Sequence, residues 1–344
     1  MFTLQNFALL DLLIASIMLL GLGYVHRYRL PRPPVGRFTT SDVLIMSGLV
    51  VVLPVAYLAM PAPVVSTVFG VMFLASVQLA LAPLLGGRTA TLAAVLLVAA
   101  TAWAALSGQA TLVVVLNAVL IVVSVIGVTS LWTQTGITAG HVAAFATALA
   151  VYDLFATGLG DMTDRFLAQV EGYPFAPLLA VTTGAVPVAA GLGDCLILAL
   201  WPMVATKAYG KAAGWTGAAV GLGLIVLVQI GFATGVLRSG MAFLTVLGPA
   251  ILVQYLIWRR LRGAERHTWQ WLGGPGPAID TSGRVDRLAA ALRTPDAAPG
   301  TADGTWEAIG ADGVIAEGPT PGTALRAARR AGYQDVPFIR QRTT

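Results

Sequence analysis

The chain has 344 residues, of which 57% are hydrophobic and only 11% are charged, and its mean hydropathy is +0.79. This composition excludes an ordinary soluble globular domain and indicates a polytopic membrane protein with a polar tail. The formal net charge of +5 lies entirely in residues 1–262, because residues 263–344 contain nine acidic residues, nine arginines and no lysine. A neutral tail offers no basic surface to a phosphate backbone, so the sequence argues against nucleic-acid binding.

Nine segments in the first 262 residues approach the roughly 20 apolar residues that an α-helix needs to cross a bilayer. They are residues 7–24, 43–60, 63–85, 89–106, 110–131, 137–158, 190–208, 212–236 and 241–258. The sequence therefore predicts an all-α polytopic membrane domain of nine transmembrane helices in residues 1–262. Helices one to five fall in residues 1–136, and helices six to nine fall in residues 137–262.

The stretch between the sixth and seventh segments has no clear periodicity. Residues 175–190 are apolar, but Pro177, Gly184 and Pro187 interrupt them. Irregular backbone is tolerated at membrane depth only where protein shields it or where it lines water. The sequence leaves three interpretations open: an extension of the seventh helix, a re-entrant segment, or a cover over a cavity.

Basic residues are distributed unequally between the two sides of the nine segments. If the N-terminus is outside, the outer loops hold only Arg165 and Arg238, whereas eleven basic residues lie on the inner side. The eleven are Arg27, Arg29, Arg32, Arg37, Arg88, Lys207, Lys211, Arg259, Arg260, Arg262 and Arg266. Since cytoplasmic loops carry the excess of Arg and Lys, we expect an outside N-terminus and a cytoplasmic tail. The preference for Arg over Lys, with abundant Ala and Gly, favours a prokaryotic plasma membrane.

The tail divides into a linker and a small folded module. Residues 263–304 are predicted to be a flexible linker, with a short helix at residues 285–292 as one possibility. Residues 305–344 predict a small cytoplasmic α+β module of ββαβ order, with a hairpin turn at Asp312-Gly313 and a helix that starts at Thr320-Pro321. Its candidate core residues are Trp306, Ile309, Val314, Leu325 and Phe338.

Two aspartates lie in segments that are otherwise apolar, Asp153 in the sixth and Asp194 in the seventh. An ionisable group at membrane depth costs several kcal/mol unless it is neutral, paired or hydrated, so it marks a functional site. The two segments run in opposite directions, and both aspartates would sit about 6–8 Å below the outer edge. Two neighbouring carboxyl groups share one proton, so the ionised one can activate water while the protonated one polarises a carbonyl.

Three motifs follow one another on the sixth, seventh and ninth segments: Tyr152-Asp153, the run Gly191-Leu192-Gly193-Asp194, and the run 248–251 with the sequence Gly-Pro-Ala-Ile. This order resembles the presenilin and signal peptide peptidase family of intramembrane aspartyl proteases. That family carries Tyr-Asp, Gly-x-Gly-Asp and Pro-Ala-Leu on the same three of nine helices. The resemblance implies that the chain is a microbial homologue of this family. It also implies an aspartic-type endopeptidase that needs no cofactor. It would hydrolyse peptide bonds within transmembrane segments of membrane proteins or signal peptides.

The resemblance also implies roles for individual residues. Asp153 and Asp194 would be the catalytic pair, and the predicted orientation is that of the signal peptide peptidase branch, with substrate N-termini facing the cytoplasm. The residues implied in substrate binding are Tyr152, Gly191, Leu192, Gly193, Pro249, Ala250 and Ile251. Ile251 stands where the family has leucine, which affects substrate preference rather than the reaction. The alternative for the glycines is helix packing by small residues, and for Tyr152 it is aromatic packing.

Other classes of function remain as alternatives. A prepilin-peptidase-like protease shares Gly-x-Gly-Asp but lacks the Tyr-Asp and Pro-Ala-Leu context. A proton-coupled membrane transporter could use the same aspartates as a relay, and a proteolytically silent scaffold would need neither. No His, Glu or Asp cluster has zinc-ligand spacing, and Cys195 is the only cysteine, so no metal site is predicted. The expected partners are the lipid bilayer and transmembrane-helix protein substrates.

Overall fold

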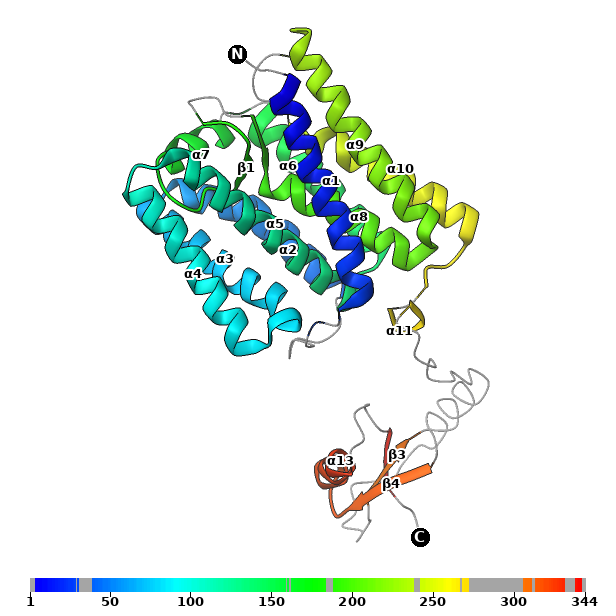
Figure 1. Ribbon diagram of the computed structural model, residues 1–344. Helices are drawn as coiled ribbons and strands as arrows, with labels where there is room; N and C mark the ends of the chain where they lie inside the picture. Colours follow the sequence, from blue (N-terminus) through cyan, green and yellow to red (C-terminus); the bar gives the residue numbers. More distant parts are fainter. Residues whose placement is uncertain are drawn as a thin grey trace. The chain divides into compact units, whose positions relative to one another are not determined.

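Figure 1 shows the computed structural model of the chain, which contains two compact units, residues 1–272 and residues 273–344. The structure describes residues 4–28, 30, 39–158, 160, 162–183, 188–237, 242–266, 268–271, 306–310, 313–331 and 338–341. The first unit is built from long helices, and the second contains a small sheet with one helix. Each unit has its own apolar core.

Within the described residues, seven helices are long and apolar enough to cross a membrane. They are α1 (Leu4–Arg27), α2 (Thr40–Leu58), α3 (Ala62–Leu85), α4 (Gly87–Leu106), α5 (Ala110–Gln134), α6 (Ala139–Asp153) with its continuation η1 (Leu154–Gly158), and α9 (Lys211–Ala233). Many large apolar side chains on their outer faces are exposed, as expected where lipid is the solvent. These long apolar helices indicate an integral membrane protein.

The other two predicted segments also form helices, α8 (Leu192–Tyr209) and α10 (Leu244–Arg262). Neither is among the seven candidate spans. The acidic and basic residues of α8 are Asp194 and Lys207, and α10 ends in a run that contains three arginines. All nine predicted segments therefore contain a helix, but on length and apolar composition the structure supports seven spans rather than nine.

The central helix of the first unit is α8, which packs against α1, α5, α6, α9 and α10. Every residue from Ile197 to Tyr209 is buried. In Figure 1, α3 and α4 lie on one flank of the bundle and α9 and α10 on the other, with α8 between them. A charged side chain in a helix that faces protein rather than lipid can find polar partners there, which accounts for the buried Lys207 on α8.

Glycines on α9 allow α8 to carry large side chains at this interface. A Cβ on Gly217 would lie 2.9 Å from the indole of Trp201, and one on Gly221 would lie 2.9 Å from Leu198. Such distances are shorter than real Cβ atoms show, so a side chain at either glycine would force Trp201 or Leu198 to move. Small residues that permit close backbone approach are typical of interfaces between membrane helices.

The ambiguous stretch before α8 contains a short antiparallel hairpin, followed directly by the helix. Strands β1 (Leu178–Ala180) and β2 (Ala189–Gly191) pair with Leu178 opposite Gly191, and α8 begins at Leu192. Residues 184–187 lie outside the described part of the chain. The described residues therefore do not extend α8 backwards. A separate helix, α7 (Met162–Val170), lies between η1 and this hairpin.

The second unit has the predicted ββαβ order. Strands β3 (Trp306–Gly310), β4 (Gly313–Gly318) and β5 (Phe338–Gln341) form one antiparallel sheet with β3 in the middle, and α13 (Pro321–Arg330) lies between β4 and β5 in sequence. The core is made by Ala308, Ala324 and Ala328, against which Trp306, Ile315 and Ala316 pack.

The predicted core of this unit is wrong at Val314, which is 49% exposed. A bulge shifts the register between Ala308 and Ile309, so Ile315 packs against the core where strict alternation would place Val314. Ile309 and Leu325 are partly buried. The side chain of Phe338, the turn residue Asp312 and the possible helix at residues 285–292 lie outside the described residues.

Candidate active site

Asp153 is the last residue of α6, at the point where the helix continues as the π-helical turn η1. Its side chain is partly buried, and both of its oxygens accept hydrogen bonds. The hydroxyl of Thr157 donates to Oδ1 at 2.8 Å, and the backbone amide of Leu244 donates to Oδ2 at 3.0 Å. A π-helical turn within a helix is frequent at functional sites; here Thr157 lies on η1, four residues after Asp153.

The bond from Leu244 joins α6 to the start of α10. The first amides of a helix have no intrahelical acceptor, and a carboxylate near them is favourable. Phe243, at the N-cap of α10, supplies no side-chain bond. Asp153 therefore serves as the acceptor for the first amide of α10 and fixes the end of one helix to the beginning of another.

Asp194 lies in the first turn of α8, directly after the hairpin. Its Oδ2 accepts a hydrogen bond from the amide of Gly191 at 3.1 Å. Gly191 is both the last residue of β2 and the N-cap of α8, and the amide of Leu192 donates to the carbonyl of Pro177 at 2.9 Å. A Cβ on Gly191 would lie 3.1 Å from Oδ2 of Asp194, so this position favours a residue without a side chain.

The structure brings these two aspartates together. Helices α6 and α8 pack against each other. Asp153 ends the first and Asp194 begins the second, so both lie at the same end of the bundle. The two carboxyl groups are close enough for the charge of Asp153 to act on Asp194. Two motifs that are 41 positions apart in the chain therefore meet in one place.

The third motif lies within α10 and contributes mainly to packing. A Cβ on Gly248 would lie 2.5 Å from the carbonyl oxygen of Ala146 and 2.7 Å from the Cβ of Ala150, so glycine lets α10 approach α6 closely. Pro249 is exposed and Ala250 is partly buried, whereas Ile251 is completely buried. Of the three residues predicted to bind substrate here, Pro249 and Ala250 lie where another molecule could reach them, and Ile251 lies in the core.

Two residues of α7 contact the helix that carries Asp153. The hydroxyl of Tyr152 donates to the sulfur of Met162 at 3.6 Å, and the hydroxyls of Thr157 and Thr163 are 2.7 Å apart. Sequence reasoning missed both threonines. The signal that could have found Thr157 is its place four residues after Asp153, at the spacing that brings side chains together on a helix. Gly193 is exposed, and a Cβ there would meet no atom within 4 Å.

Polar side chains of α3 and α5 hold the chain that enters the hairpin. Asn117 is 6% exposed, and its amide nitrogen donates to the carbonyls of Ala176 at 2.8 Å and Leu178 at 3.2 Å. Ser66 donates to the carbonyl of Pro174 at 2.6 Å. Between them, Phe175 has a φ of 66°, a conformation that non-glycine residues rarely adopt. These contacts fix β1 against the bundle, and through β2 they fix the start of α8.

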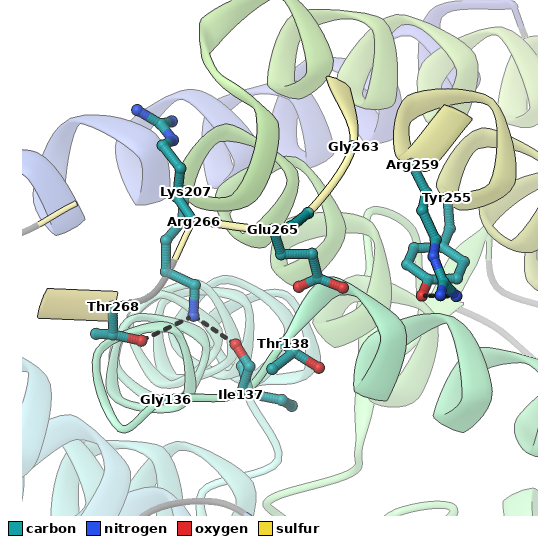
Figure 2. A pocket seen from close by; sticks show the side chains of 11 residues that line it. Gly136, Ile137, Thr138, Lys207, Tyr255, Arg259, Gly263, Glu265, Arg266 and Thr268 are labelled. Atoms are coloured by element: carbon teal, nitrogen blue, oxygen red, sulfur yellow. Dashed lines mark hydrogen bonds between the residues drawn. The ribbon is translucent and has the colours of Figure 1, made fainter. Parts of the chain in front are cut away.

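A second polar region lies at the other end of α6 and α8, around a cavity of about 360 Å³ (Figure 2). Lys207 is 2% exposed, and Figure 2 shows its amino group between Thr268 and Ile137. It donates to the carbonyls of Thr133, at 3.0 Å, and of Ile137, and to the hydroxyl of Thr268 at 3.4 Å. Lys207 thus binds the carbonyls at the end of α5 and is not a surface residue of an inner loop.

The segment after α10 caps two helices at this cavity. Both carboxylate oxygens of Glu265 accept backbone amides at the start of α6, from Ala139 at 2.7 Å and Gly140 at 3.0 Å. Arg266 donates to the last carbonyls of α8, from its guanidinium to Thr206 at 2.6 Å and from its amide to Ala208 at 3.1 Å. An acid at a helix start and a base at a helix end are the favourable placements. Lys207, Glu265 and Arg266 are therefore engaged in holding the helices, whereas Arg259 donates to Tyr255 of its own helix at 3.1 Å.

Comparison of the chain with protein-family models, with curated proteins and with solved structures gave no match. The resemblance to the presenilin and signal peptide peptidase family therefore depends on the three motifs and their order. Among the described residues, no group of three or more His, Cys, Asp or Glu side chains is placed to hold a metal ion. Among the described residues, the pair of aspartates is the arrangement best suited to catalysis, because two neighbouring carboxyl groups can act as acid and base.

Proposed function

We propose that this chain is an intramembrane aspartyl endopeptidase of the presenilin and signal peptide peptidase type, with Asp153 and Asp194 as its catalytic pair. One observation carries the proposal. The two acidic residues that were singled out from separate motifs lie on packed helices, where α6 ends and α8 begins, and they interact electrostatically. Among the described residues, the donors to the pair are backbone amides and one hydroxyl and no basic side chain: Leu244 and Thr157 donate to Asp153, and Gly191 donates to Asp194. That arrangement leaves the pair available for proton transfer.

The topology that accompanies this proposal has nine spans, with α8 and α10 as the seventh and ninth. Protein surrounds α8, so Asp194 and Lys207 need not face lipid. The last turn of α10 contains arginines, as expected at a cytoplasmic boundary. The N-terminus is then outside, the second unit is in the cytoplasm, and the membrane is a prokaryotic plasma membrane.

The hairpin suggests how a substrate would be held next to the pair. A peptide bond inside a transmembrane helix must be unwound before water can reach it, and an extended segment can add to the edge of a sheet. Asn117 occupies the carbonyl of Leu178 at the start of β1 and that of Ala176 just before the strand. We therefore place the substrate strand along β2, whose last residue, Gly191, is three positions from Asp194. The substrates are transmembrane segments of other membrane proteins or signal peptides.

The test is cleavage of a labelled transmembrane peptide by the purified protein in detergent and in liposomes. Asp153→Asn and Asp194→Asn, singly and together, should abolish cleavage, because each removes one carboxyl group with little change in shape. Asp11→Asn is the matched control: Asp11 lies in α1 and accepts a hydrogen bond from Gln229 at 2.7 Å, away from the pair. Its cleavage rate should equal that of the wild type.

Mass spectrometry of the products should locate the cut within the apolar part of the peptide. Cleavage that persists in the double variant would refute the aspartyl mechanism. Proton-dependent uptake by the liposomes in the absence of any cleavage would favour the transporter alternative, since a transporter would use the same two carboxyl groups for proton transfer.

A further inference from the structure

Hydrogen-bond donors are distributed unequally between the two aspartates. Asp153 accepts on both oxygens, from Thr157 at 2.8 Å and from the amide of Leu244 at 3.0 Å. Asp194 accepts on Oδ2 from Gly191 at 3.1 Å, and within the described chain no donor reaches its Oδ1. Donors stabilise the ionised form of a carboxyl group relative to its protonated form. The proton that the pair shares is therefore better accommodated on Asp194.

Resting on the proposed protease function, we propose that Asp153 is the general base and Asp194 the general acid. Thr157 is then a positioning residue that stabilises the ionised form of Asp153. It touches neither substrate nor water in this scheme and acts only through the carboxylate. Its place on the π-helical turn η1 brings its hydroxyl to Oδ1.

Thr163 fixes the direction of the bond that Thr157 makes. A threonine hydroxyl has one proton to donate and can also accept. Because Thr157 donates its proton to Asp153, the bond of 2.7 Å between the two threonines requires Thr163 to donate to Thr157. The three side chains therefore form a directed chain from α7 to the end of α6, with the negative charge of Asp153 as its last acceptor.

The charged groups near Asp153 do not provide a competing explanation. On α6, η1 and the helices packed against them, the charged and titratable side chains are Asp42, Tyr57, His141, Tyr152, Asp164, Arg165, Asp194, Cys195, Lys207, Tyr209, Tyr255, Arg259, Arg260 and Arg262. Glu265, after α10, binds amides at the start of α6. Asp42 accepts bonds from the amide and hydroxyl of Thr39 at the start of α2, and Lys207 donates to Thr133 and Thr268 at the polar cavity. The negative group coupled to Asp153 is Asp194. Two neighbouring carboxyl groups share one proton, and the number of donors then decides which residue holds it.

The reaction balances with these roles. Ionised Asp153 takes a proton from water as the water oxygen attacks the scissile carbonyl carbon, and Asp194 gives its proton to the carbonyl oxygen. The resulting gem-diol carries two hydroxyl groups. Asp153 then gives its proton to the amide nitrogen as the C–N bond breaks, and Asp194 takes a proton from one hydroxyl. The products are a carboxylic acid and an amine, and both aspartates return to their starting states.

The experiment is the pH dependence of kcat/KM for cleavage of the labelled transmembrane peptide. The acid limb of such a profile reports the ionisation of the base in the free enzyme, and the basic limb reports the acid. Thr157→Val keeps the shape of the side chain but removes the donor, so the acid limb should move to higher pH by about one unit. At pH values below that limb, kcat/KM should fall about tenfold. Thr163→Val should give a smaller shift in the same direction.

Two controls separate this effect from a general loss of packing. Thr157→Ser retains the hydroxyl and should restore the wild-type profile. Thr147→Val removes a hydroxyl of the same helix that donates at 2.8 Å to its own backbone, at Ala143, and should leave both limbs unchanged. A shift of the basic limb alone would reverse the assignment, because Asp153 would then be the acid. An unchanged profile in Thr157→Val would remove Thr157 from the mechanism.

The proposed function fails by a different result. If Asp153→Asn and Asp194→Asn still cleave the peptide, the pair is not catalytic at all. If both aspartate variants are inactive but Thr157→Val has the pH profile of the wild type, the protease function stands and the assignment of base and acid is wrong.

Discussion

Gly248 determines how closely α10 approaches α6. A Cβ at this position would lie 2.5 Å from the carbonyl oxygen of Ala146 and 2.7 Å from the Cβ of Ala150. Ala150 lies three residues before Asp153, and Leu244, whose amide binds Asp153, lies four residues before Gly248. The close contact and the hydrogen bond therefore join the same two helices within about one turn. A change in one should disturb the other.

Gly248→Ala should therefore destabilise the protein and slow cleavage, whereas most glycine-to-alanine changes within a helix stabilise it. The new methyl group cannot fit without moving α10, at a cost of about 1–3 kcal/mol in the free energy of unfolding. Gly223→Ala in α9 is the matched control, because a Cβ there would meet nothing within 4 Å. Thermal unfolding in detergent measures both. Equal stability of the two variants would show that α10 can shift without penalty.

For single residues, the sequence could reveal charged groups in apolar segments. It could not reveal residues whose role depends on a partner far away in the chain. Asp153 and Asp194 stand out because charge is rare in apolar segments. Asn117 does not, since its bonds reach carbonyls 59 and 61 positions away in the chain. Gly248 belonged to a recognisable motif, yet its contact with Ala146 appears only once α6 and α10 are packed together.

Among the elements, the segment that follows α10 has the most consequence for the helices that carry the aspartates. Glu265 accepts two amides at the start of α6, and Arg266 binds carbonyls at the end of α8. Both residues line the cavity shown in Figure 2. Asp153 and Asp194 lie at the opposite ends of the same two helices. The segment thus holds both helices at one end while the aspartates meet at the other.

Glu265→Ala should destabilise the first unit, because two amides at the start of α6 lose their acceptors. Loss of a helix cap lowers the free energy of unfolding by about 1–2 kcal/mol. Glu171→Ala is the control, since Glu171 is an exposed acid outside any helix or strand. Thermal unfolding followed by circular dichroism should show a lower midpoint for Glu265→Ala alone. If both variants unfold like the wild type, water replaces the carboxylate at no cost.

The elements differ in how well the sequence predicts them. Long apolar runs predict helices with ends within a few residues of those observed, as for α3 and α4. The hairpin before α8 has two strands of three residues each, which is too short for an alternating pattern to be recognised. In β4 a bulge places Ile315 against the core instead of Val314, which was predicted there. Local pattern therefore predicts long elements and misses those that tertiary contacts stabilise.

At the scale of the whole first unit, α8 shows why a span that we propose need not have the length and apolar composition of a lipid-facing helix. A threshold on apolar composition assumes that a helix faces lipid, but α8 is enclosed by five other helices. Composition could predict a polytopic membrane protein, and segment lengths could predict nine helices. Neither could indicate that the seventh predicted segment is the centre of the bundle, because enclosure is a property of the assembled structure.

The orientation of α9 in the membrane shows whether α8 is a span, and so distinguishes nine spans from seven. With α8 as a span, Lys211 at the start of α9 is cytoplasmic and Val236 just after its end is outside; without α8 as a span, the two sides exchange. Both positions suit labelling, since Lys211 is exposed and Val236 is 79% exposed. The native Cys195 is buried and gives little background. A membrane-impermeant maleimide should therefore label Val236→Cys in intact cells and Lys211→Cys only after permeabilisation. The reverse pattern would exclude α8 as a span, and it would leave Asp194 without a place inside the bilayer.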